Sequence, residues 1–143
     1  MYKSLITTLM LSAGLVGCSL GVAPGRNSPS LTFQAPVSYQ AALASAQRQA
    51  ELCLRGKKTY DVVTEQDAAI KTATLRVTAP YTSNDLARVE IAGQGDKRSD
   101  VRVVMWGESI WNGDAVRAMR DAVLYDLPSC TSFMPVDAAP PKK

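Results

Sequence analysis

The feature that most constrains the fold is a strict alternation of apolar and polar side chains that recurs from residue 72 onward. In residues 72–79 the apolar side chains Ala73, Leu75 and Val77 alternate with threonine and arginine, and Pro80 follows. Such alternation is typical of antiparallel strands with one buried and one solvated face. A weaker segment precedes it, so we expect a four-stranded antiparallel meander. Its strands are residues 59–66, 72–79, 87–91 and 100–106.

Two segments with helical apolar spacing flank the expected strands. Ser38 is a candidate N-cap for a helix that runs to about residue 54, and Asn112 or Ser109 is one for a helix over residues 114–127. Each helix has one apolar face, which in the first is mostly alanine. The sequence therefore predicts an α+β fold. It is a two-layer sandwich in the order α-β-β-β-β-α, with both helices on one face of the sheet.

The N-terminus has the features of a secretory signal. Lys3 precedes a short apolar run, residues 5–16, which is too short for a transmembrane helix of about 20 residues. The run ends in Leu15-Val16-Gly17-Cys18, which resembles the lipobox of bacterial lipoproteins. The resemblance implies cleavage before Cys18 and acylation of this residue on sulfur and nitrogen. The alternative is a soluble secreted protein in which the cysteine is coincidental.

The resemblance also implies a location, and the composition of the chain suggests a division into parts. In bacterial lipoproteins an Asp after the lipidated Cys favours retention in the inner membrane, and here that position is Ser19. We therefore expect a lipid anchor on the periplasmic face of the outer membrane. The expected parts are a signal peptide (1–17), a lipidated tether (18–36) with at most a short extended piece at residues 31–33, an α+β domain (37–131) and a disordered tail (132–143).

Two cysteines remain when Cys18 carries lipid. Cys53 and Cys130 are an even pair in an oxidising compartment, which favours a disulfide; two separate buried thiols are the alternative. The expected topology leaves the pair one helix length, about 20 Å, apart. A bridge therefore requires a connection that crosses back after residue 55, steeply crossed helices, or a different number of strands.

Other segments strengthen a family resemblance. The lipobox, the helix end "RQAELC" and the stretch "VRVVMWGESIWNGDAVRAMRDAVLYDLPSC" are similar to a group of small proteobacterial outer-membrane lipoproteins. In that group two cysteines flank a helix–meander–helix core. The resemblance covers residues 30–131 and implies no particular activity. More loosely, the layout is similar to the helix-grip domains of outer-membrane assembly lipoproteins.

The residue types argue against catalysis. The chain has no His and no Ser-x-x-Lys sequence, so the usual nucleophile–base pairs are absent. Two thiolates without His are too few for a structural zinc site. The Gly93-Gln94-Gly95 stretch joins two expected strands, so we interpret it as a hairpin, and Asp61 and Glu65 as solvated charges. We therefore expect no enzyme, no cofactor and no metal.

The expected outer face of the sheet is the candidate interaction surface. Arg76, Arg88 and Arg102 fall on it in three consecutive strands and could form a basic strip for an anionic partner. The alternative is a solvated face on which Glu90 pairs with arginine. Three apolar residues complete the candidate face, although the tryptophans could instead close the end of the core. They are Val104, Trp106 and Trp111.

These residues lead to two functional hypotheses. The first is a non-catalytic interaction or envelope-maintenance module that binds an envelope protein or peptidoglycan, to which Lys142 and Lys143 could add a contact. The second is a binder of a small apolar or lipid ligand between helices and sheet. The formal net charge of +3 is too small to indicate nucleic acid.

Overall fold

The computed structural model describes residues 20–22 and 27–130 of the 143-residue chain. The expected signal sequence, the expected lipidation site Cys18 and the expected tail with Lys142 and Lys143 lie outside these residues. Among the helices of the described part, none combines the length and the apolar character needed to cross a bilayer.

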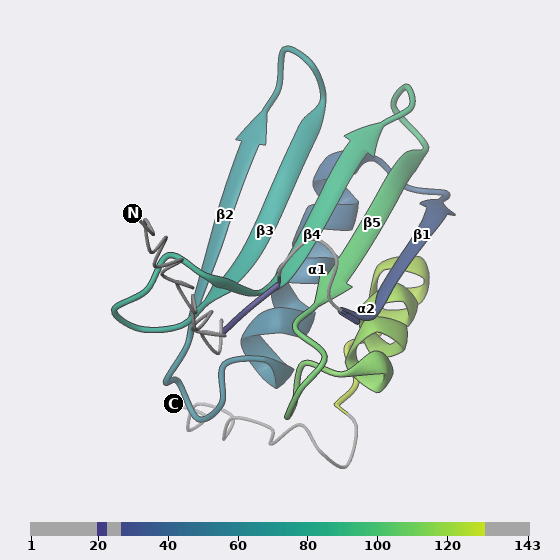
Figure 1. Cartoon of the computed structure of the whole chain (residues 1–143). Helices are drawn as coiled ribbons and strands as arrows, with labels where there is room; N and C mark the ends of the chain where they lie inside the picture. The colour runs from purple at the N-terminus through teal and green to yellow at the C-terminus, as the bar shows by residue number, and fades with distance from the viewer. Residues whose placement is uncertain (1–19, 23–26, 131–143) are drawn as a thin grey trace, which may run out of the picture.

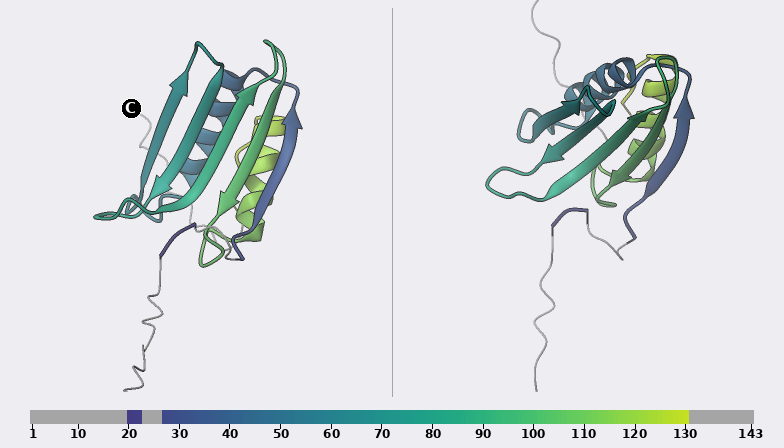
Figure 2. Two further views of the ribbon diagram at one scale, coloured as in Figure 1. Left: turned by 45° about the horizontal axis from the view of Figure 1, so that its top comes forward. Right: turned by 90° about the horizontal axis from the view of Figure 1, so that it is seen from above.

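The described chain forms a five-stranded antiparallel sheet with two helices on one of its faces (Figures 1 and 2). The strand order is β1-β5-β4-β3-β2, and the four strands from β2 to β5 form the expected meander. The expected α+β class with helices on one face is confirmed. The elements are β1 (Ser30–Ala35), α1 (Tyr39–Cys53), β2 (Asp61–Asp67), β3 (Thr72–Thr78), β4 (Asp85–Gly93), β5 (Ser99–Met105) and α2 (Gly113–Tyr125).

The number of strands differs from the expectation of four. Strand β1 lies within the residues expected to form the tether, and it pairs antiparallel with β5 at the sheet edge. In this register Leu31 lies opposite Val103 and Phe33 lies opposite Val101. The extended piece expected near residues 31–33 is therefore a full strand, because it finds a partner strand about 70 residues later in the chain. The folded unit consequently begins before residue 37.

Side-chain caps fix the start of both helices. The Ser38 hydroxyl accepts a hydrogen bond from the Ala41 amide at 3.2 Å, which confirms the expected cap of α1. Asn112, one of the two candidates, caps α2 by accepting from the amides of Asp114 and Ala115 at 2.9 and 3.1 Å. Helix α2 ends at Tyr125, where Asp126 takes a left-handed conformation with φ 55°.

The core lies between the sheet and the helices, as the alternation predicted. The expected inward side chains of β3, β4 and β5 are all buried. Alanine covers much of the facing side of α1, so the helix lies close to the strands. The buried alanines of α1 are Ala42, Ala46 and Ala50, and the buried inner side chains of the sheet include Leu75, Val77, Val89, Ile91, Val101, Val103 and Met105.

A disulfide joins Cys53 at the end of α1 to Cys130, with Cα atoms 5.3 Å apart. The expected bridge is therefore confirmed. The added strand β1 precedes α1 and leaves four strands between the helices, so the bridge is reached in another way. After Asp126 the chain turns back and runs beside the second half of α1. Four extended residues from 126 to 130 span about 13 Å, which matches the roughly 12 Å of helix from Ser45 to Cys53.

Candidate functional site

The three candidate arginines lie on the sheet face that points away from the helices, opposite the buried inner side chains of the same strands. Arg76 on β3 lies opposite Arg88 on β4, which in turn lies opposite Val104 on β5. Arg102 lies opposite Glu90, one pleat further along the same face. The register thus brings the arginines together as the alternation predicted. Like charges directly opposite on a sheet are destabilising unless other groups compensate them.

Carboxylates compensate all three arginines. Asp85 binds Arg88 through two guanidinium nitrogens, one of them Nε at 2.7 Å, and it lies 3.5 Å from Nη1 of Arg76. Glu65 lies 3.3 Å from Arg76, and Glu90 lies 3.4 Å from Arg102 and 3.9 Å from Arg88. This ion-pair network contains three carboxylates and three guanidinium groups. It therefore has no formal net charge, and the outer face is not a strip of unpaired positive charge.

Asp85 is the member of the network that sequence reasoning missed. Its side chain is only 3% exposed, although it lies on the outer face. In a regular strand Asp85 would share the inner face with Ala87, two residues on. The β3–β4 register shifts between Val77 and Thr78, so that Thr78 lies opposite Asp85 while Val77 lies opposite Ala87. This bulge turns the carboxylate outward to meet the arginines.

Residues 20–22 cover this end of the outer face. The Val22 amide donates a hydrogen bond to the Asp85 carbonyl at 2.7 Å. Gly21 is buried with φ +108°, and a Cβ atom there would lie 2.9 Å from the Asp85 oxygen and 3.0 Å from Cβ of Asn84. Only glycine fits this close approach without a shift of backbone. We call residues 20–22 the N-terminal strap; it crosses the start of β4 in Figure 1.

Two of the apolar candidate residues are not exposed, which corrects the expectation. Val104 is on the outer face by register but is buried. The chain before β1 lies beside it, because the amide of the next residue, Met105, donates a hydrogen bond to the Pro29 carbonyl at 3.0 Å. Trp111 is 3% exposed and packs edge-on against Tyr60, with ring centroids 4.6 Å apart. Trp106 is half-buried beside it. The tryptophans therefore close the end of the core.

A shallow hollow of about 380 Å³ lies on the outer face beside the ion-pair network, with which it shares Glu90 and Arg102. Threonine and alanine side chains form much of its lining, while Glu90, Arg102 and Asp100 bring charges of both signs. The sequence signal was present, because the outward positions of β3 run from the small side chains of Thr72 and Thr74 to the long side chain of Arg76. The small residues at this hollow are Thr32, Thr72, Thr74 and Ala92.

The two carboxylates expected to be solvated are exposed. Asp61 and Glu65 are exposed on the edge strand β2, with Glu65 paired to Arg76 as above. Lys71 and Asp96 join two hairpin turns through a 2.9 Å hydrogen bond. That bond, followed by Coulombic attraction, raises the pKa of Lys71 above 10.5 and lowers the pKa of Asp96 below 3.8. Within the described residues no group of three His, Cys, Asp or Glu side chains is arranged to hold a metal.

The space between helices and sheet, where the second hypothesis places a ligand, is closely packed in the described chain. Leu75, Val89, Val103 and Met119 are completely buried there. Two hollows, of about 380 and 220 Å³, lie instead on the outer face of the sheet and beside β2.

Comparison with known proteins adds no family: no protein-family model and no curated protein matches the chain. Function must therefore be inferred from the N-terminal sequence and from the residues of the outer sheet face.

Proposed function

We propose that the chain is a lipoprotein anchored through Cys18 to the periplasmic face of the outer membrane, and that its domain is a non-catalytic interaction module. The lipobox supports the anchor. The Cys53–Cys130 disulfide is consistent with an oxidising compartment such as the periplasm. The outer sheet face supports the interaction role, and the envelope partner we favour is a protein.

The observation that carries the interaction role is the hollow bordered by charges of both signs. Threonine methyl groups and alanine give it an apolar floor, and Arg102, Glu90 and Asp100 give it polar edges. Interfaces between proteins combine an apolar centre with a polar rim in the same way. A purely anionic polymer would instead favour a surface of unpaired positive charge. The mixed rim therefore favours a polypeptide partner.

The arginines differ in how freely they can meet a partner. Arg76 and Arg88 are tied to the buried Asp85, so replacing them would disturb the fold. Arg102 is 56% exposed and pairs only with the half-exposed Glu90 among the described residues. Replacing Arg102 leaves the buried Asp85 and its two arginines in place, so among the three arginines it disturbs the sheet least.

The test is site-specific photo-crosslinking in intact cells from a position at the hollow, such as Thr74, with and without Arg102→Glu. The matched control is Arg117→Glu on α2, which is 62% exposed on the helical side of the molecule. We expect Arg102→Glu to abolish a discrete crosslinked protein band and Arg117→Glu to leave it. Loss of the band in both variants, or in neither, would contradict the choice of face. Co-sedimentation with purified peptidoglycan, lost in Arg102→Glu alone, would identify the polymer instead of a protein.

A further inference from the structure

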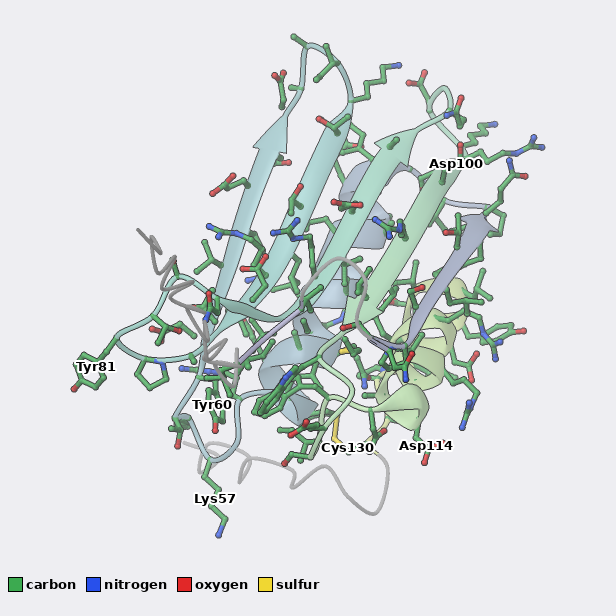
Figure 3. All side chains as sticks on the ribbon, in the orientation of Figure 1. Lys57, Tyr60, Tyr81, Asp100, Asp114 and Cys130 are labelled. Carbon is green, nitrogen blue, oxygen red and sulfur yellow. A yellow bond between two sulfur atoms is a disulfide. The ribbon has the colours of Figure 1, made fainter. Side chains whose placement is uncertain are left out.

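Three segments of the described chain meet at one end of the sheet. They are the N-terminal strap, the β3–β4 loop with Tyr81, and the α1–β2 loop with Lys57 (Figures 1 and 3). We propose that this end, with Tyr81 at its tip, is a membrane-contact surface that lies in the headgroup region of the phospholipid layer. The proposal rests on the lipid anchor at Cys18 and adds the orientation of the domain.

The strap places the anchor at this end. Val22 is bonded to the start of β4, and Gly21 packs against Asn84 of the β3–β4 loop. Only three residues lie between Cys18 and Val22. Four residue steps of extended chain span at most about 14 Å, so an anchor at Cys18 cannot be further than this from Val22. A tether that left the body at residue 37 would allow the domain to turn freely. Here the chain is bound to the domain close to the anchor, which limits that freedom.

Packing in the core does not account for the position of Tyr81. Its side chain is fully exposed, whereas Tyr39 is buried and Tyr60 packs on Trp111. Its backbone is left-handed with φ 64°, a conformation that is costly for a bulky residue. Within the described residues, this backbone conformation does not bring the Tyr81 side chain into contact with the core. Tyrosine is enriched at the boundary between lipid and water, where the ring meets apolar chains and the hydroxyl meets water.

Two neighbouring features fit the same surface. Lys57 and Lys58 are exposed in consecutive left-handed positions of the α1–β2 loop, and ammonium groups are attracted to anionic headgroups. Leu20, the first described residue of the strap, is also exposed. With only two lysines, the acyl chains and Tyr81 would provide most of the contact. The partner surface is therefore a phospholipid layer with some anionic lipid.

The opposite end of the sheet offers an internal control. Ile70 is exposed in the β2–β3 turn, at the end of the sheet away from the strap. Both Tyr81 and Ile70 are exposed aromatic or apolar side chains in turns. Only the first should reach lipid if the domain is oriented as proposed.

The experiment uses the full lipidated protein in phosphatidylethanolamine–phosphatidylglycerol vesicles that contain brominated lipid, a quencher of tryptophan emission. Tyr81→Trp and Ile70→Trp each add one indole, and the wild-type protein gives the baseline from Trp106 and Trp111. We expect the emission added at position 81 to shift to the blue and to be mostly quenched. We expect the emission added at position 70 to be unchanged by bromination.

Equal quenching at both positions, or none at position 81, would overturn the proposed orientation. A second readout needs no variant: amide hydrogen exchange of residues 79–84 should slow in vesicles relative to detergent, while exchange of residues 67–71 should not. An intact mass of each sample separates the two proposals. A lipidated protein with an unquenched position 81 refutes only the orientation, whereas an unlipidated mass refutes the anchor itself.

Discussion

The side-chain amide of Gln49 pairs with the main chain of Ser129 in both directions. Gln49 Nε2 donates to the Ser129 carbonyl at 2.8 Å, and the Ser129 amide donates to Gln49 Oε1 at 2.9 Å. Gln49 is buried on α1, and Ser129 adjoins the bridged Cys130. The Gln49 side chain thus makes the two main-chain hydrogen bonds that a neighbouring strand would otherwise make to the extended segment before Cys130.

We expect Gln49→Ala to lower the free energy of unfolding by about 1–2 kcal/mol, because two hydrogen bonds are lost and a buried side chain leaves a cavity. Urea unfolding followed by circular dichroism would measure the change. Ser129→Ala keeps the main-chain groups and should be nearly neutral, as should Gln47→Ala on the exposed side of the helix. A neutral Gln49→Ala would show that the pairing contributes no stability.

Asp85→Asn should destabilise the fold by about 2–3 kcal/mol. It removes the one buried charge between Arg76 and Arg88, and the partial exposure of both arginines reduces the loss below that of a fully buried pair. Glu65→Gln also removes a partner of Arg76, but its side chain is 69% exposed, so we expect a change within about 0.5 kcal/mol. Equal effects in the two variants would contradict the structural role of Asp85.

The Lys71–Asp96 pair predicts a specific pH dependence. The hydrogen bond to Lys71 lowers the pKa of Asp96, so the stabilising contribution of this carboxylate is present above 3.8 and is lost as pH falls through its folded-state pKa. The pKa of Lys71 is raised, so its contribution is present below 10.5 and is lost as pH rises through the folded-state value. Carboxyl NMR titration should give Asp96 a midpoint below 3.8. Lys71→Gln should return it to the ordinary value, and an unchanged midpoint would refute the pairing.

Gly21→Ala should release the N-terminal strap. The new Cβ would meet the Asp85 oxygen at 2.9 Å, so the Val22 amide should lose its protection from hydrogen exchange. Gly95→Ala is the matched control: Gly95 also has a positive φ, +73°, but no atom lies within 4 Å of its added Cβ. In Gly95→Ala the hydrogen-exchange rate of the Val22 amide should be unchanged. Retained protection in Gly21→Ala would mean that the strap does not depend on this close approach.

The inner layer could be predicted from sequence because its signals are local. Period-two alternation from Ala73 to Met105 identified the buried face, and Ser38 identified the start of α1. The pairing of Cys53 with Cys130 followed from the even number of cysteines left after Cys18. In each case the residues that carry the signal lie within the element or belong to a small countable set.

The remaining features depend on contacts that are distant in sequence. Strand β1 is a strand because β5 completes it, and its six residues between Pro29 and Pro36 gave only the weak signal of a short extended piece. The orientation of Asp85 depends on a bulge that alternation cannot reveal. The path to Cys130 depends on the left-handed Asp126 and on Gln49. The exposure expected of Trp111 and Val104 was wrong because Tyr60 and the chain around Pro29 cover them.

The most direct test of the proposed lipoprotein is the intact mass of the protein purified from membranes, with and without reduction before alkylation. We predict the mass of residues 18–143 plus acyl chains, with two alkylations that appear only after reduction. A chain of that length without acyl groups would contradict the anchor at Cys18, and two alkylations before reduction would contradict the Cys53–Cys130 bridge.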